Sequence, residues 1–325
     1  MSGEHVLEIR DLATYFFLRR GVVKAVDGVS LNLRRGEILG LVGESGCGKS
    51  VTALSIMRLL PKSSARTVRG EVRLGGENIL TRSQRDMREI RGRRISMILQ
   101  DPQTSLNPVF SVGEQLREAI FRRTRRRKPE IMKEAVELLR RVEIPAPDQR
   151  ISQFPHQMSG GMKQRIVGAI AMSGRPEVLI ADEPTTALDA TIQLQYLKLL
   201  KHLQSETDMA ILFITHDFGV VATMCNRVAV MYAGRIVECG PVAQILKHPS
   251  HPYTQALIAS VPAISDATGR LPTIDGQPPS LMNLPPGCRF APRCAHADAR
   301  CRSIYPSTFT TAVDHTADCW RLEGQ

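Results

Sequence analysis

One stretch of the sequence has the residue types and the spacing of a phosphate-binding loop. It reads Gly-x-x-x-x-Gly-Lys-Ser, followed by Val51, and consists of Gly43, Glu44, Ser45, Gly46, Cys47, Gly48, Lys49 and Ser50. Glycines allow backbone N–H groups to turn inward and bind phosphate oxygens. The Lys49 ammonium can reach the β- and γ-phosphates, and the Ser50 hydroxyl can bind Mg²⁺. Taken alone, the stretch could also be a chance glycine-rich turn.

A strand and a helix must flank such a loop, and the sequence predicts both. The apolar run Ile38–Val42 precedes the loop and is typical of a buried strand. Val51–Leu60 follows with helical spacing and stops at Pro61. The N-terminus of this helix would place partial positive charge beside bound phosphates.

A second group of candidate residues ends another apolar strand. Leu179–Ala181 leads directly into Asp182 and Glu183. Asp182 can hold the hydration shell of Mg²⁺, and Glu183 can act as general base on an attacking water. The alternative is a strand end that simply needs polar residues.

Three further positions are weaker signals when each is read alone. Ser159, Gly160 and Gly161 stand where a helix is predicted to begin, so they form either an anion-binding nest or an ordinary helix cap. His216 closes a predicted strand, where a structural role is the more common one. Gln100 also follows a strand.

Length and composition set broad limits. The 325 residues suffice for one large domain with an appendage, and no apolar run reaches the length of a bilayer span. The start of the chain shows no secretory signal, so we expect a cytosolic or peripheral membrane protein. The net charge of +11 permits nucleic acid, anionic lipid or an anionic substrate as partner, without choosing among them.

Four of the seven cysteines gather near the end of the chain, namely Cys288, Cys294, Cys301 and Cys319. In a cytosolic chain such a cluster indicates a metal site rather than disulfides. The gaps between them are five, six and seventeen residues, whereas zinc sites favour about two to four between paired ligands. The spacing leaves an iron–sulfur cluster, zinc and no metal open.

The distribution of strand-forming, helical and proline-rich segments predicts how the chain is organised. Strand-forming segments before the loop predict antiparallel β structure that runs into an α/β core, and residues of about 101–174 are mainly helical in pattern. Proline becomes frequent after about residue 249. We therefore predict one domain over 1–250 and a small, irregular, cysteine-rich extension over 251–325.

Taken together, the motifs resemble the nucleotide-binding subunit of ABC transporters. The set comprises residues 43–50, Gln100, 159–161, Asp182-Glu183, Ala187-Leu188-Asp189 and His216, in this order. Residues 100–108 and 251–257 and the four-cysteine tail are similar to the dipeptide/oligopeptide (and nickel) importer branch. The resemblance implies a P-loop ATPase cassette, with a RecA-like core, an antiparallel β subdomain and a helical subdomain.

The resemblance also implies roles for individual residues. Two cassettes would pair head to tail, with ATP between the phosphate loop of one and the signature of the other, here Ser159, Gly160, Gly161 and Met162. Gln100 would sense the γ-phosphate and Mg²⁺ and touch the permease. Asp189 would communicate across the dimer, and His216 would hold the γ-phosphate and the attacking water. The expected catalytic residues are therefore Glu183, Gln100 and His216.

Two further sites follow from the resemblance. An aromatic residue near the first strand should stack on adenine; Phe16 aligns best, and Tyr15 and Phe17 are alternatives. The importer branch carries a [4Fe–4S] cluster at such a tail, so the four cysteines are its expected ligands. A structural and a redox-sensing role for this cluster both stay open.

The predicted function is that of the ATP-hydrolysing subunit of an importer for di- or oligopeptides, using ATP and Mg²⁺. Its partners would be a second cassette, usually a paralogue, two permease subunits and an extracytoplasmic solute-binding protein, with no nucleic acid. It would lie at the cytoplasmic face of the inner membrane. Import of nickel or another small solute is the alternative, and a soluble nucleic-acid-associated ABC ATPase is a more distant one.

Overall fold

The computed structural model describes residues 5–124, 127–186, 188–260 and 273–324. The chain forms two compact units, each assembled from segments that are distant in sequence. The first unit consists mainly of Thr81–Phe213. The second combines Leu7–Leu33, Ile38–Leu80 and Ile214–Gln325. The predicted division near residue 250 stays a prediction.

An antiparallel sheet in the second unit confirms the β structure predicted for the start of the chain. Its strands run in the order β2 (Gly21–Arg34), β1 (His5–Leu18), β4 (Ala65–Leu74) and β5 (Glu77–Asn78). The β4–β5 turn is Gly75-Gly76, with φ of 55° and 81°. Two residues with positive φ are what a tight hairpin requires, and glycine adopts them without strain.

The second unit also contains the strand that leads into the phosphate loop. This strand, β3 (Ile38–Val42), pairs parallel with β9 (Arg227–Tyr232), and β9 turns back into β10 (Arg235–Pro241). All five residues of β3 are buried, which explains its unbroken apolar sequence. The helix after the loop, α1 (Lys49–Met57), ends three residues earlier than predicted, because Arg58 adopts a left-handed conformation with φ of 52°.

The tail is less irregular than the sequence predicts. Strand β12 (His315–Ala317) pairs antiparallel with β10, and β11 (Phe309–Ala312) pairs with β12. These strands are too short to show an alternating pattern. A buried contact between the His315 imidazole and the Glu238 carboxylate, at 2.8 Å, fixes β12 instead. The remaining elements of the unit are η1 (Ile79–Thr81), α9 (Phe218–Met224), α10 (Val242–Lys247), α11 (Pro252–Ala259), η3 (Ala291–Arg293), α12 (Ala299–Ser303) and η4 (Trp320–Leu322).

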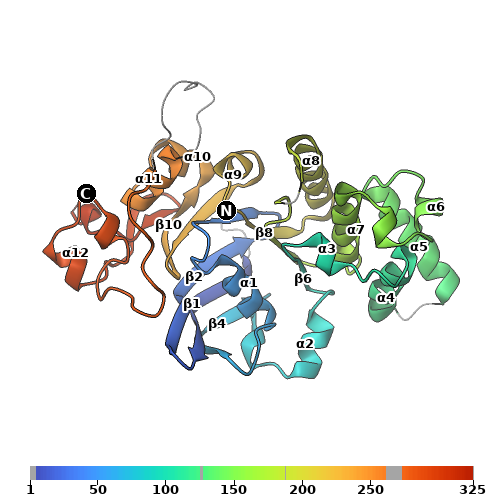
Figure 1. The fold of residues 1–325 in the computed structure, drawn as a ribbon, viewed down its shortest axis with the longest axis horizontal. Helices are drawn as coiled ribbons and strands as arrows, with labels where there is room; N and C mark the ends of the chain where they lie inside the picture. Colours follow the sequence, from blue (N-terminus) through green and yellow to red (C-terminus); the bar gives the residue numbers. More distant parts are fainter. Residues whose placement is uncertain (1–4, 125–126, 187, 261–272, 325) are drawn as a thin grey trace. The chain divides into compact units, whose positions relative to one another are not determined.

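The first unit combines parallel strands with a group of helices. Strand β7 (Val178–Asp182) pairs parallel with β6 (Ile95–Ile98) on one side and neighbours β8 (Ala210–Ile214) on the other. The helical character predicted for about 101–174 is confirmed over the described residues (Figure 1). The helices are α2 (Gln84–Ile90), α3 (Pro102–Ser105), α4 (Val112–Thr124), α5 (Lys128–Arg141), α6 (Pro147–Arg150), η2 (Pro155–Gln157), α7 (Gly160–Met172) and α8 (Ala190–Thr207).

Candidate functional site

The phosphate loop connects β3 to α1 and depends on its glycines. Gly43, Gly46 and Gly48 have φ of 154°, 78° and 114°. A Cβ atom on Gly43 would lie 2.1 Å from the Met231 carbonyl oxygen, and one on Gly48 would lie 2.2 Å from the Ala25 carbonyl oxygen. Both approaches are closer than real Cβ contacts, so a side chain at either position would push the loop away from its neighbouring strands.

The Lys49 side chain lies on the inner side of this loop. Its ammonium donates to the carbonyl oxygens of Gly43 at 2.8 Å and Glu44 at 3.1 Å, and the residue is only 5% exposed. Lys49 and Ser50 form the first turn of α1, whose N-terminal N–H groups carry partial positive charge. The loop therefore provides an ammonium, a hydroxyl and backbone donors, which suit a polyphosphate and its Mg²⁺.

The three candidate aromatic residues lie on opposite faces of β1. Side chains alternate along a strand, so Tyr15 and Phe17 share one face while Phe16 lies on the other. Thr14 is on the face of Phe16, and its hydroxyl lies 2.9 Å from the Ser55 hydroxyl of α1. Phe16 is thus on the side of the helix that begins at the phosphate loop. Which ring stacks on adenine stays a prediction.

His216 follows β8 and lies beside the strand that leads into the phosphate loop. The backbone N–H of Thr215 donates to the Leu41 carbonyl oxygen at 3.2 Å, which brings the two strand ends together. The next residue, Asp217, caps α9 through its carboxylate. The His216 side chain is exposed at this end of the second unit.

In the first unit, the ends of β6 and β7 bring two predicted catalytic residues together. Ile98 of β6 pairs with Ala181 of β7, so the residues after each strand emerge at the same edge. The Gln100 amide donates to the Glu183 carboxylate at 3.1 Å. Asp182, one residue earlier, is 4% exposed. The prediction that Gln100 and Glu183 share one site is consistent with this contact.

Glu183 has a backbone conformation that side-chain-bearing residues rarely adopt. Its φ is 45°, and its carboxylate also accepts a hydrogen bond from the Thr186 hydroxyl at 3.0 Å. Strained backbone of this kind concentrates at functional sites. The carboxylate is therefore held in a fixed direction at the strand end, as a general base requires.

The signature residues form the exposed start of α7. Ser159 is the N-cap, and its hydroxyl accepts the Met162 backbone N–H at 3.3 Å. A Cβ atom on Gly160 would meet nothing within 4 Å, whereas one on Gly161 would lie 2.7 Å from Ile192. The start of this helix is therefore open to another molecule.

Asp189 has a defined local role. Its carboxylate caps α8 by accepting the backbone N–H groups of Thr191 at 3.1 Å and Ile192 at 3.0 Å. Its predicted role across a dimer is not tested by this contact. Ala187, which belongs to the same motif, lies outside the described residues.

The four tail cysteines line one small cavity. It has a volume of about 20 Å³, and the Cys288 backbone N–H donates to the Cys301 carbonyl oxygen at 2.7 Å. Burial, with smaller contributions from the Cys301 and Cys319 thiols, raises the pKa of Cys288 to about 11. A cavity of this size holds about one water molecule. That is less space than the eight atoms of a [4Fe–4S] cluster need.

The predicted cluster is not supported by the side-chain arrangement. Within the part of the chain that the structure describes, no group of three or more His, Cys, Asp or Glu side chains is placed to hold a metal ion. The shared cavity shows that the cysteines converge, but their thiols do not form a ligand set as they stand.

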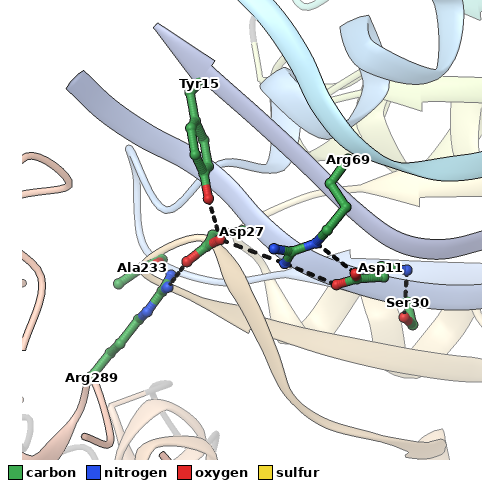
Figure 2. Close-up of polar contacts among 7 residues, drawn as sticks. All are labelled: Asp11, Tyr15, Asp27, Ser30, Arg69, Ala233 and Arg289. Carbon is green, nitrogen blue, oxygen red and sulfur yellow. Dashed lines mark hydrogen bonds and ion pairs between the residues drawn. The ribbon is translucent and has the colours of Figure 1, made fainter. Parts of the chain in front are cut away.

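Sequence reasoning missed the residues that attach the tail to β1 and β2. Figure 2 shows the Arg289 guanidinium bound to the Asp27 carboxylate and to the Ala233 carbonyl oxygen. The Tyr15 hydroxyl donates to the other Asp27 oxygen at 2.6 Å. Burial raises the Asp27 pKa, but the Tyr15 hydrogen bond and the Arg289 charge outweigh it and leave the pKa below its usual value. Nothing in the sequence indicated this contact, because Arg289, which follows Cys288, belongs to no recognisable motif.

Two family models match the chain. The model described as ABC transporter matches residues 26–186, and the one described as oligopeptide/dipeptide transporter, C-terminal region, matches residues 237–301. Among the described helices, none combines the length and the apolar character of a membrane span.

Relatives and solved structures resemble the chain over most of its length. A probable peptide ABC transporter ATP-binding protein of Sinorhizobium fredii is 52% identical, over 98% of this chain and 96% of its own. The dipeptide transport ATP-binding protein of Bacillus subtilis is 49% identical, over 98% and 95%. The dimeric post-hydrolysis state of an ATP-binding cassette, bound to ADP and Pi, matches with a TM-score of 0.65 and 26% identity, over 73% of this chain and 98% of that one.

Proposed function

The chain belongs to the ATP-binding proteins of ABC transporters, and from this premise we propose that it is the ATP-hydrolysing subunit of a di- or oligopeptide importer. The observation that carries the ATPase assignment is the Gln100–Glu183 contact at the end of β7, directly after buried Asp182. The names of the relatives and the match of residues 237–301 support peptides as the cargo.

The proposed reaction is hydrolysis of ATP to ADP and phosphate. Residues 43–51 would bind the phosphates, with Lys49 on the β- and γ-phosphates, and Ser50 and Asp182 would hold Mg²⁺, which would neutralise charge on the phosphates. Glu183 accepts a proton from the attacking water, and Gln100 and His216 contact the γ-phosphate and that water. Among the aromatic residues, Phe16 is proposed to stack on adenine.

The exposed signature supports a dimer of cassettes. Ser159, Gly160, Gly161 and Met162 would bind the nucleotide of a partner cassette, proposed to be a paralogue, with Asp189 at the contact. The backbone N–H groups at the start of α7 and the Ser159 hydroxyl suit the γ-phosphate. One chain thus supplies half of each of two sites.

A cavity in the first unit supports contact with a permease. It has a volume of about 710 Å³ and is bordered by Leu99 and Phe121, which are 45% and 49% exposed, and by Arg88 and Arg93. Exposed apolar side chains around this cavity suit an amphipathic segment of a membrane subunit, and Leu99 directly precedes Gln100 in the chain. The proposed location is the cytoplasmic face of the inner membrane, where the protein would bind two permease subunits that receive cargo from a solute-binding protein.

The decisive experiment is to purify the chain with its membrane partners and measure ATPase activity with candidate solutes. Di- and oligopeptides delivered by the binding protein should stimulate hydrolysis. Stimulation by nickel instead would assign the alternative cargo of the same branch. Co-purification with nucleic acid and without permeases would contradict the importer.

For the tail, we propose one metal centre bound by Cys288, Cys294, Cys301 and Cys319, with a [4Fe–4S] cluster as the expected group. The convergence of the four cysteines on one cavity supports this proposal, and the cysteines would have to move apart to become ligands of a cluster. Such a centre would serve as a covalent staple for a segment with a small core.

Metal analysis separates the possibilities. Anaerobically purified protein should be brown and contain about four iron and four sulfide per chain. Stoichiometric zinc without sulfide would replace the cluster with a zinc staple. If the protein contains neither iron nor zinc, the four cysteines are reduced thiols and the proposed metal centre is wrong.

A further inference from the structure

A buried arginine of the tail lies against the phosphate loop. Arg293, at the end of η3, donates to both oxygens of the Glu44 carboxylate, at 2.8 and 3.1 Å. Its side chain is 4% exposed. The remaining donors bind the Tyr232 hydroxyl and the carbonyl oxygens of Ile274 and Asp275. This is the two-pronged geometry in which an arginine–carboxylate pair is strongest.

The backbone of the same loop residue is also held by the tail. The Glu44 N–H donates to the Tyr253 hydroxyl at 3.0 Å. Tyr253 is fully buried in α11, and its ring packs against Tyr232 and Phe290 with centroids 4.5 and 5.4 Å apart. Both the side chain and the backbone of Glu44 are therefore fixed by residues beyond position 250.

These contacts continue into the residue that should bind phosphate. The Lys49 ammonium donates to the Glu44 carbonyl oxygen at 3.1 Å. A shift of Glu44 would therefore move a partner of Lys49 as well as the first turn of the loop. A phosphate-binding loop works through several backbone N–H groups that must point at one ligand. Ordering such a loop before the ligand arrives lowers the entropic cost of binding.

We propose that Arg293 and Tyr253 are positioning residues of the nucleotide site. They fix Glu44, and through it the loop, so that the N–H groups and Lys49 are arranged before ATP binds. Neither residue touches the nucleotide. The tail is thus part of the nucleotide-binding machinery, independently of any metal that its cysteines bind. This inference rests on the proposed function, which places ATP at this loop.

The test measures ATP affinity of the full chain by calorimetry, with Mg²⁺ and under conditions without turnover. Arg293→Met should weaken ATP binding about three- to tenfold. A loss of this size corresponds to the entropic cost of ordering one or two side chains on binding. Tyr253→Phe, which removes a single hydroxyl, should weaken it about twofold to threefold. Arg293→Lys should restore part of the affinity, because lysine keeps the charge but lacks the planar fork.

A double-mutant cycle separates positioning from general loss of stability. Glu44→Gln should weaken ATP binding about as much as Arg293→Met, and the double variant should be no weaker than either. Arg300→Met is the matched control, because it breaks the Arg300–Glu323 ion pair in the same tail, away from the loop. It should leave ATP affinity unchanged, even if it lowers the melting temperature.

The outcomes distinguish failure of the positioning role from failure of the proposed ATP-binding function. If Lys49→Ala binds ATP normally, the phosphate-loop assignment is wrong, and the positioning role falls with it. If Lys49→Ala loses affinity while Arg293→Met, Tyr253→Phe and Glu44→Gln bind like the wild type, the positioning role alone is overturned. Strictly additive effects of Arg293→Met and Glu44→Gln would also overturn it.

Discussion

The phosphate loop and the signature turn differ in what surrounds them. The loop is packed from several sides: Lys49 is 5% exposed, Gly43 and Gly48 lie against neighbouring strands, and the tail binds Glu44. The signature turn has one internal cap, from Ser159 to Met162, and open space at Gly160. The loop is completed within the chain, whereas the signature turn is an exposed helix start, whose first backbone N–H groups have no partner within a helix.

The difference indicates which region works alone. Buried and cross-braced donors can bind a ligand at low entropic cost without help. Exposed donors at a helix start gain strength only when a second surface excludes water from them. We therefore expect lesions in the loop to affect the isolated chain, and lesions in the signature to appear only in the assembled transporter.

The largest effect should come from Glu183→Gln. The amide cannot accept the proton of the attacking water, so hydrolysis in the assembled transporter should fall about 10²- to 10⁴-fold, while ATP binding persists. Single-turnover assays check this. Glu137→Gln, which changes an exposed ion pair with Arg140 in the same unit, is the control. Near-normal turnover would refute the assignment of the base.

Ser159→Arg should sharpen the comparison most directly. The bulky cation blocks the start of α7, so transport-coupled hydrolysis should fall about 10²-fold or more, as for loss of transition-state donors. ATP affinity of the isolated chain should not change. Ser152→Arg, at an exposed position in the same unit, controls for the added charge. Loss of ATP binding by the isolated chain would break the comparison.

Unlike Ser159→Arg, Lys49→Ala should already weaken ATP binding by the isolated chain. The isolated chain should bind ATP roughly ten- to hundredfold more weakly, since hydrogen bonds from a charged group are worth about 1.5–3 kcal/mol. Calorimetry on the isolated chain is the measurement. Lys62→Ala, at an exposed position beyond α1, should bind normally. An unchanged affinity for Lys49→Ala would count against the loop.

The smallest expected effect concerns pH. Because the pKa of Asp27 is held below its usual value near 3.8, its pair with Arg289 stabilises the fold fully above about pH 5. That stability is lost as the pH falls through the folded-state pKa. Acid unfolding should therefore be steeper for the wild type than for Asp27→Asn. Equal slopes for the wild type and Asp27→Asn would contradict the role of this pair.

The sequence predicted the elements that carry local signals. The glycines at 43 and 48 and the apolar runs of β3 and β7 each impose their structure within a few residues. The same local logic placed Gln100 and Glu183 each after a strand, and the structure adds that the two strands are neighbours and the two side chains are in contact.

The contacts of the tail could not be predicted in this way. Arg289 and Asp27 are 262 residues apart, and Arg293 and Glu44 are 249 apart, so no spacing links them. Strands β11 and β12 are too short for periodicity, and their pairing depends on the buried Glu238–His315 contact. The cluster was expected from resemblance alone, and the packing of the thiols does not yet support it.

The late position of the tail has a consequence for synthesis on the ribosome. Glu44 is translated early, but Tyr253 follows 209 residues later and Arg293 another 40 after that. At about 5–20 residues per second, the growing chain waits roughly 12–50 s before the last of these partners is made. A nascent cassette thus contains every glycine and the lysine of its phosphate loop before it contains Tyr253 and Arg293, which hold Glu44 in place. We expect tight ATP binding to begin only after Arg293 has been synthesised.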